Sequence, residues 1–301
     1  MKDIMQQATN KITIIGKLLD ATFNKGTTSE GKPYERANLT VRVTHTYGGR
    51  TETSEIPVSA FATQYTKTGA INPAFTNIQS LKEFKTAQNV GIDNADSIRM
   101  TSANLQENAF VAKSGQLVNG WQIRSSFFNP GKGIDETATF SVDIFIMDMH
   151  EEMDREENPT GRLIIKGGIV QYGGKLDVVE FVVESPECVE HISRNWQVND
   201  TVNARGRIRF TSLEEKRASS ESSWGEEVPE TTTRTMRELI ITTGDPEGKE
   251  EEFAYDQAEI KKAFNVRKAN MEQLQLDAKN KASKPAASST AAPAKNAYSW
   301  E

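Results

Sequence analysis

The chain has 301 residues, and its 36 basic and 42 acidic side chains give a formal net charge of −6. This length indicates about two domains, and the hydrophobic fraction of 36% predicts that part of the chain is loop and tail. The single cysteine excludes an intramolecular disulfide, and no run of about 18 apolar residues predicts a membrane span. The first ten residues contain no apolar signal core, so we expect a cytoplasmic protein.

The net charge conceals a division along the chain. Residues 1–134 carry 15 basic and 10 acidic side chains, for a net charge of +5. Residues 135–278 carry 17 basic and 31 acidic side chains, for a net charge of −14, and residues 279–301 have a net charge of +3. Such asymmetry indicates that the two halves meet different partners.

The first half predicts a small β-barrel. In chain order we expect strands at 10–18, 35–45 and 51–61, a short helix within 75–88, and strands at 97–112 and 120–128. Gly16 lies in the middle of the first strand and predicts a bulge or a barrel bend. In the second strand Leu39, Val41 and Val43 alternate with polar residues and should face inward. Five strands with a helix between the third and fourth follow the order of an OB-type barrel.

A second strand-rich block follows a linker predicted at 129–133. We expect strands at 139–149, 162–172, 175–184, 200–210 and 237–245, and a short helix at 185–196. The polar insert at 214–233 is predicted to be mobile. Because the helix again comes after a hairpin and before two strands, this block is interpreted as a divergent, OB-like repeat. The pattern leaves a duplication and an independent origin about equally open.

These elements give a mainly β fold class: an OB-fold barrel, a second strand-rich OB-like domain, a C-terminal helix and a disordered tail. The helix is expected to be amphipathic and to dock on the second domain or on a partner, because apolar residues recur in it at near-helical spacing. These residues are Ile260, Ala263, Phe264, Met271 and Leu274. The predicted divisions are an N-terminal arm at 1–9, the OB-fold domain at 10–130, the acidic β domain at 135–255, the helix at 256–281 and the tail at 282–301.

Catalytic patterns are missing from the sequence. None of the three histidines has metal-ligand spacing, and there is no phosphate-binding glycine loop. A cation site in the acidic stretch 148–157 is less favoured than a solvated loop. Cys188 is interpreted as a small buried hydrophobe. The sequence therefore predicts no enzyme, no cofactor and no metal.

Residues suited to binding nucleic acid gather in the first half. Single-stranded nucleic acid is held by cations that contact phosphate and by aromatic faces on which bases stack. The predicted nucleic-acid-binding residues are Lys17, Lys32, Tyr34, Arg36, Arg42, His45, Tyr47, Arg50, Arg99, Trp121, Arg124 and Phe128. Lys25, Lys113 and Phe127 are further candidates.

Each candidate also has a structural interpretation. Trp121 and Phe127 could equally fill the core, and Arg36 and Arg42 could form a solvated strand face. Tyr47 lies at a loop tip with no core nearby, which favours binding. In the second half Arg205, Arg207 and Arg209 share one strand face. We favour their pairing with that domain's own carboxylates over an extension of the binding path.

The opening strands resemble those of single-stranded DNA-binding proteins of the bacterial and phage type. The resemblance rests on NKITIIGKL, GKPYERANLTVRVTH and SEIPVSAF and covers roughly residues 10–128. It implies an OB-fold with stacking aromatics and cationic grooves, no catalysis, and protection of single strands during DNA replication, recombination and repair. The family's acidic tail is replaced here by a C-terminal segment, residues 279–301, of net charge +3, and the second domain is additional. The chain is therefore more similar to a two-domain phage version, acting in the host cytoplasm.

The sequence thus predicts a non-enzymatic protein that coats single-stranded DNA. Replication or recombination proteins are expected to bind the acidic domain or the C-terminal tail. The alternative is a protein-interaction or replication-accessory module whose acidic domain binds a protein partner. A metal-dependent nuclease is a third class, which metal-dependent strand cleavage would reveal. Oligomeric state, site size and RNA binding are left open.

Overall fold

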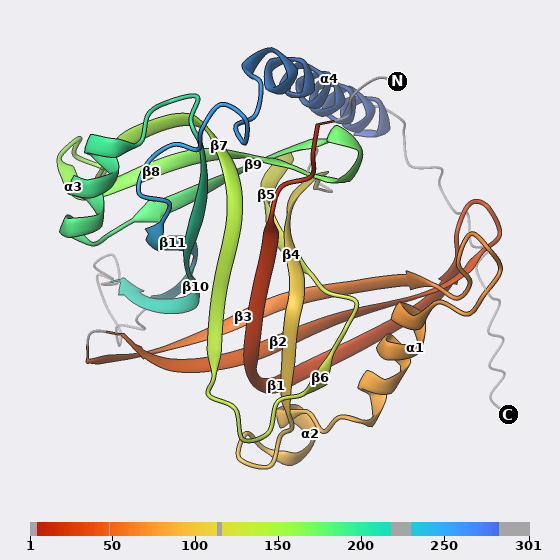
Figure 1. The fold of residues 1–301 in the computed structure, drawn as a ribbon. Coiled ribbons are helices and arrows are strands. Elements are labelled where there is room, and N and C mark those ends of the chain that lie inside the picture. Colours follow the sequence, from red (N-terminus) through yellow and green to blue (C-terminus); the bar gives the residue numbers. More distant parts are fainter. Residues whose placement is uncertain (1–4, 48, 113–115, 218–229, 283–301) are drawn as a thin grey trace, which may run out of the picture.

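A computed structural model describes residues 5–47, 49–112, 116–217 and 230–282 of this chain. Within these residues, eleven strands form one continuous sheet (Figure 1). The strands are β1 (Asn10–Thr27), β2 (Pro33–Tyr47), β3 (Arg50–Thr63), β4 (Ser97–Val111), β5 (Leu117–Arg124), β6 (Asn129–Pro130), β7 (Thr137–Met153), β8 (Pro159–Val170), β9 (Leu176–Val183), β10 (Thr201–Arg217) and β11 (Glu230–Gly244). The helical segments are α1 (Pro73–Ser80), η1 (Leu81–Glu83), α2 (Ala87–Val90), η2 (Tyr172–Gly174), α3 (Pro186–Asn195) and α4 (Gln257–Ala282). The predicted mainly β class with a C-terminal helix is confirmed.

The sheet closes twice into barrels with the same strand order. In the first barrel the order is β1-β2-β3-β5-β4, and β4 pairs back onto β1. In the second barrel the order is β7-β8-β9-β11-β10, and β10 pairs back onto β7. The third and fifth strands of each barrel are parallel, and helical segments connect the third strand to the fourth. Both barrels therefore have the OB-type order, as the repeat interpretation expects.

Strand β1 joins the two barrels. Its first half pairs with β4 on one side and with β7 on the other, and its second half pairs with β2. A Cβ atom on Gly16 would lie 2.2 Å from the backbone oxygen of Arg42, so only glycine permits this approach. The register shifts between Leu18 and Asp20. The irregularity of β1 beside β2 thus lies between Leu18 and Asp20 rather than at Gly16, where the two strands approach closely.

Strand β2 has the alternation that the sequence predicts. Leu39, Val41 and Val43 are buried, whereas Arg36 and Thr44 are exposed. Each fully buried side chain of this size stabilises the fold by roughly 1.5–3 kcal/mol. The buried side chains of both barrels form one continuous core. This core fixes which face of the β2–β3 hairpin points outward.

Several element bounds differ from the sequence predictions. Strands β10 and β11 extend into the predicted insert, where residues 230–233 pair with 214–217, because threonine-rich segments favour strands. Pro130 of the predicted linker pairs with Ile98 as part of β6. The helix predicted within 75–88 is split because Phe84 is extended (φ −76°, ψ 138°). The predicted tail from residue 283 onward and Lys113 lie outside the described residues.

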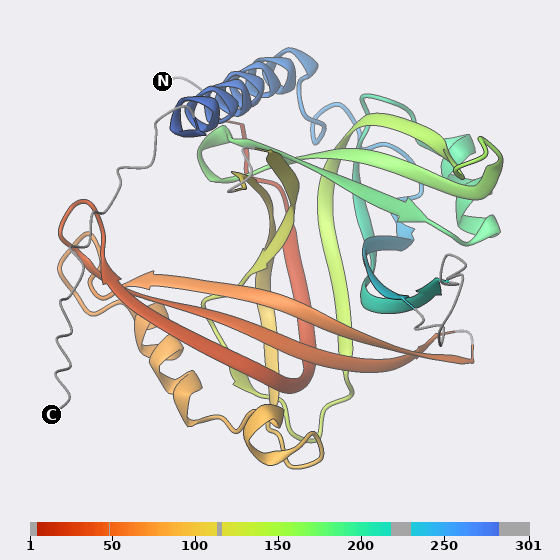
Figure 2. The ribbon, with the colours of Figure 1, turned by 180° about the vertical axis from the view of Figure 1, so that it is seen from behind.

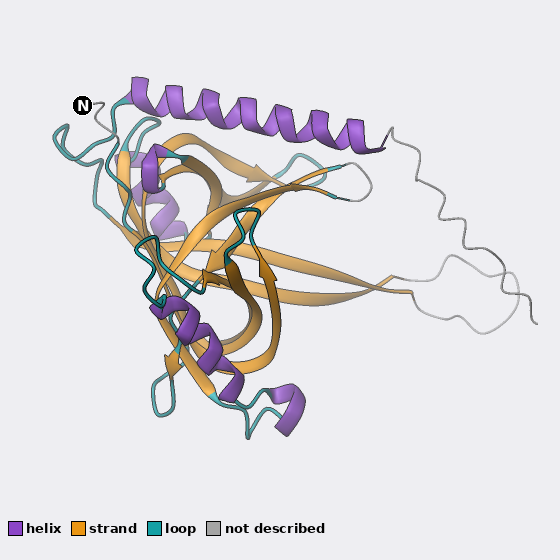
Figure 3. Cartoon of the chain, turned by 90° about the vertical axis from the view of Figure 1, so that its right-hand side faces the viewer, coloured by secondary structure: helices purple, strands orange, loops and turns teal. Residues whose placement is uncertain are grey.

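Helix α4 lies across one end of the two barrels (Figures 2 and 3). It contacts β4 of the first barrel and β9 of the second. Ile260 is buried, and Ala263 and Phe264 are half-buried against the core. The docking surface predicted for this helix therefore includes both barrels rather than the second alone. In the described part of the chain, no helix is long and apolar enough to cross a membrane.

Candidate nucleic-acid interface

Two half-exposed phenylalanines line one cavity on the outside of the first barrel. Phe61 of β3 is 47% exposed, and Phe127, which follows β5, is 48% exposed. The cavity has a volume of about 400 Å³. Its lining is Phe61, Ser102, Asn104, Gln106, Arg124, Ser125, Ser126 and Phe127. Aromatic, cationic and amide groups are thus presented together on one surface.

The β2–β3 hairpin extends this surface. Arg36 is the cross-strand neighbour of Phe61, and the ring of Tyr34 lies 5.1 Å from that of Phe61 at an angle of 39°. We call the set Tyr34, Arg36, Phe61, Arg124 and Phe127 the aromatic groove. Arg36 and Arg124 are exposed, and neither forms an ion pair with a described carboxylate. Both guanidinium groups are therefore available to an anionic ligand.

Hydrogen bonds to the backbone on both sides of Phe127 hold this turn in place. The Ser125 amide donates to the Ser59 carbonyl (3.0 Å). Asn77 of α1 accepts from the Phe128 amide (2.6 Å) and donates to the Phe128 carbonyl (3.2 Å). Phe128 is consequently buried, and Phe127 projects outward. The groove is preorganised on a rigid scaffold.

The structure corrects the prediction for Phe128. It is 2% exposed and belongs to the core, so no base can stack on it. Strand β5 ends at Arg124, and the alternation assumed for 120–128 does not continue through the following turn. Phe127, for which core and binding roles were both open, has the exposed position. Trp121 is half-buried and packs against the core.

Three other predicted cations, Lys17, Lys32 and Arg42, form contacts within the fold. The Lys17 ammonium donates to the Ala95 carbonyl (2.8 Å), and Arg42 pairs with Glu55 (2.7 Å). The Arg42 guanidinium is therefore already paired with a carboxylate on the adjacent strand β3. Lys32 is exposed in the β1–β2 turn and pairs with Glu30 (2.6 Å). Arg99 is half-buried, opposite Asn129 of β6.

His45, Tyr47 and Arg50 lie at the opposite end of the β2–β3 hairpin from the groove. The Tyr47 ring contacts His45 (4.3 Å between centroids), and the Arg207 guanidinium lies 4.8 Å over it. The premise that Tyr47 has no packing partner is therefore wrong. Burial lowers the pKa of His45 below its ordinary value, which disfavours the charged imidazolium that would attract phosphate. Arg50 is exposed, opposite Tyr47.

The arginine stripe of β10 forms ion pairs rather than a binding path. Arg209 pairs with Glu238 (2.8 Å) and Glu184 (3.0 Å) of its own barrel, and Arg207 also pairs with Glu184. Both arginines additionally pair with Glu52 of the first barrel. Figure 1 shows the tip of the β2–β3 hairpin beside β10, where these contacts lie. The favoured interpretation, pairing with the domain's own carboxylates, is confirmed, and Glu52 is an additional partner.

The profile of the family described as YorF matches residues 8–277. The chain belongs to the YorF family. No curated protein matches the sequence.

Solved structures share the fold of this YorF-family chain. A deletion mutant of the single-stranded DNA binding protein from Thermus aquaticus has a TM-score of 0.50 at 14% identity, covering 84% of this chain and 100% of that one. The wild-type Thermus aquaticus protein has a TM-score of 0.49 at 12% identity, covering 84% and 98%. The deletion-mutant comparison supports the fold assigned above.

Sequence analysis missed Phe61, although a signal for it was present. Along β3, Glu55, Pro57, Ser59 and Phe61 occupy alternate positions, and the first two are exposed. A phenylalanine on the solvent side of an alternating strand offers an aromatic face on which a base can stack, on the same hairpin as the candidate cations. Extending the alternation of β3 to its end would have identified it.

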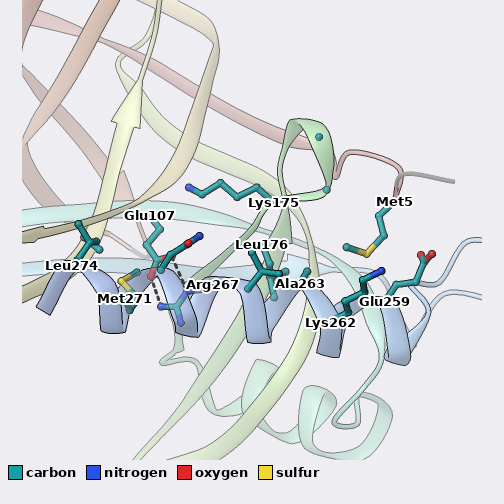
Figure 4. Close-up of a pocket in the computed structure, with 15 residues that line it drawn as sticks. Met5, Glu107, Lys175, Leu176, Glu259, Lys262, Ala263, Arg267, Met271 and Leu274 are labelled. Atoms are coloured by element: carbon teal, nitrogen blue, oxygen red, sulfur yellow. Dashed lines mark hydrogen bonds and ion pairs between the residues drawn. The ribbon is translucent and has the colours of Figure 1, made fainter. Parts of the chain in front are cut away.

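A larger cavity lies beneath α4, between β4, η2 and the N-terminal segment (Figure 4). Its volume is about 860 Å³, and its apolar lining includes Met5, Leu176 and Met271. Arg267 of α4 forms an ion pair with the buried Glu107 at its wall. This ion pair connects α4 to β4 of the first barrel. In the described part of the chain, no group of three His, Cys, Asp or Glu residues could hold a metal ion.

Proposed function

We propose that this protein binds single-stranded DNA without catalysis, through the aromatic groove of its first barrel. The observation that carries the proposal is the placement of Phe61 and Phe127 around one cavity with the unpaired Arg124. Stacking of a base on an aromatic side chain contributes about 1–3 kcal/mol, and it tolerates any sequence because every base has a π-face. The cations supply the contacts to phosphate.

The geometry favours a single strand over a duplex. In a duplex the faces of the bases are stacked on one another, so Phe61 and Phe127 could meet only the sugar-phosphate backbone. A single strand offers both its base faces and its phosphates to one shallow surface. The fold likeness to a single-stranded DNA binding protein supports the same proposal.

The wider role proposed is to coat and protect single strands during DNA replication, recombination or repair. The presence of two barrels is consistent with a two-domain, phage-type single-stranded DNA-binding protein that acts in the host cytoplasm. We assign contacts with replication or recombination proteins to the acidic second barrel or the C-terminal segment. These assignments extend the binding proposal and do not alter it.

A binding titration tests the proposal. Full-length protein is added to fluorescein-labelled oligo-dT while anisotropy is recorded, and unlabelled duplex of equal length serves as competitor. We expect binding at low salt that weakens on going from roughly 50 to 200 mM salt, with little competition from duplex. Absence of binding at low salt, or equal competition by duplex, would contradict the proposal.

A further inference from the structure

A further cavity lies where the β1–β2 turn meets the segment between β3 and α1. Its volume is about 410 Å³. Its lining is Thr28, Ser29, Glu30, Lys32, Thr63, Tyr65, Thr66, Lys67 and Asn72. Figure 1 shows these two segments side by side, at the end of the β2–β3 hairpin that is far from β10. We call this space the turn cavity.

The turn cavity continues the outward face of the aromatic groove. Phe61, Thr63 and Tyr65 occupy alternate positions at and beyond the end of β3, and the two aromatic residues are 47% and 45% exposed. Tyr34, whose ring lies 5.1 Å from that of Phe61, is the cross-strand neighbour of Thr63. Because an extended chain spans about 3.3–3.6 Å per residue, the Cα atoms of Phe61 and Tyr65 are at most about 14 Å apart. A single strand that occupies the groove therefore needs only a few more nucleotides to reach Tyr65.

Backbone hydrogen bonds fix both walls of the turn cavity. In the β1–β2 turn the Thr28 amide donates to the Lys32 carbonyl (2.8 Å). On the other wall the Thr66 amide donates to the Ala70 carbonyl (2.8 Å), which closes a tight turn directly after Tyr65. The exposed ring of Tyr65 is therefore carried by an ordered backbone. Binding does not have to order that backbone first, which lowers the entropic cost of stacking.

The charges that line the turn cavity favour an anionic ligand. The Lys32 ammonium pairs with the Glu30 carboxylate (2.6 Å). Lys67 is exposed and forms no ion pair with a described carboxylate. A hydrogen bond from Lys32 and the nearby charge of Lys67 hold the pKa of Glu30 below its ordinary value, so both lysines lie near one carboxylate. Two cations and one carboxylate leave a net charge of +1 on the lining at neutral pH.

We propose that the turn cavity is a second subsite for the single strand, in which a base stacks on Tyr65 and Lys67 and Lys32 contact phosphate. The inference rests on the proposed function and extends the path of the strand from the aromatic groove to the β1–β2 turn. Stacking on Tyr65 tolerates any base, as stacking on Phe61 does. Glu30 weakens this subsite, because its carboxylate repels phosphate and already pairs with Lys32.

Variants of Tyr65 test the stacking contact. Full-length protein is titrated with labelled oligo-dT of about 15 nucleotides, within the ~4–16 nucleotides that one OB fold binds. Tyr65→Ala should weaken binding about 5- to 150-fold, the range that loss of one stacked base allows, and Tyr65→Phe should keep the affinity. The matched control is Ile71→Ala, because Ile71 is 66% exposed and forms a β-bridge with Tyr65 but does not line the cavity. It should bind within about twofold of the wild-type protein.

Variants of the charged groups test the phosphate contact. Glu30→Gln removes the repelling carboxylate and releases Lys32, so it should bind about two- to fivefold more tightly at low salt. Glu156→Gln, in the turn between β7 and β8, changes the net charge equally at an exposed position and should leave the affinity unchanged. Lys67→Ala should reduce the slope of log affinity against log salt by about 0.7, as loss of one phosphate contact requires.

The outcomes separate this inference from the function on which it rests. Wild-type affinity in Tyr65→Ala, together with weaker binding by Phe61→Ala, would overturn the second subsite and leave single-strand binding in the groove intact. Equal losses in Tyr65→Ala and Ile71→Ala would also overturn it, because a disturbed turn would then explain both. Weaker binding by Glu30→Gln would overturn the phosphate contact. Failure of the wild-type protein to bind any oligonucleotide would overturn the proposed function and the subsite together.

Discussion

Replacing Phe61 with alanine tests the aromatic groove at its centre. Phe61 is 47% exposed, so about half of its side chain contributes to the fold. Because full burial of phenylalanine is worth roughly 1.5–3 kcal/mol, the loss of folding free energy should be about 1 kcal/mol. The exposed half is available to a base. Loss of one stacked base removes about 1–3 kcal/mol of binding, which weakens affinity for oligo-dT about 5- to 150-fold.

The assay is anisotropy of labelled oligo-dT at fixed low salt, with urea unfolding to measure stability. Phe110→Ala is the matched control, because Phe110 is also 47% exposed but lies opposite Val118 on the β4–β5 hairpin, outside the groove. Both variants should lose similar folding stability, and only Phe61→Ala should lose affinity. Equal affinities for the two variants would refute stacking at Phe61.

Four further variants probe charge. Arg36→Ala should reduce the slope of log affinity against log salt by about 0.7, as loss of one phosphate contact requires, whereas Arg42→Ala should change it less because Arg42 pairs with Glu55. Asp143 has a lowered pKa because hydrogen bonds from Lys249, Asn203 and Thr9 outweigh its burial. The ionised Asp143 carboxylate stabilises the fold above about pH 4, and this contribution is lost as the pH falls further. In urea unfolding, Asp143→Asn should therefore be less stable than the wild-type protein at pH 7. Its stability should also fall less than that of the wild-type protein on going to acid pH. Arg267→Ala leaves Glu107 buried and unpaired and should lower unfolding stability by about 3–5 kcal/mol.

Local patterns in the sequence were sufficient for the strands and the barrel order. Leu39, Val41 and Val43 of β2 are buried, as their alternation with polar residues predicts. This alternation can be read from the sequence of β2 alone, without knowing which strands pack against it. Gly16 likewise indicated a special position in β1, and it lies where β1 and β2 approach closely. The faces of regular strands could therefore be predicted, and the outward position of Arg36 followed from them.

Contacts between distant segments could not be predicted. Glu52 and Arg207 are separated by 155 positions, so nothing near Tyr47 in the sequence indicates that its hairpin packs on β10. The exchange of roles between Phe127 and Phe128 depends on where β5 ends and on Asn77 of α1. Hydrogen bonds between distant segments determine which of these two side chains is buried. The alternation of apolar and polar residues gives no information on such hydrogen bonds.

Photocrosslinking tests most directly where a single strand lies on the protein. Oligo-dT containing 5-bromouracil is bound to the full chain and irradiated, and the crosslinked peptides are identified by mass spectrometry. The groove account predicts crosslinks at Phe61, Phe127 or Tyr34, which unlabelled oligo-dT suppresses and duplex does not. Crosslinks confined to the second barrel, or none at a concentration that saturates binding, would contradict it.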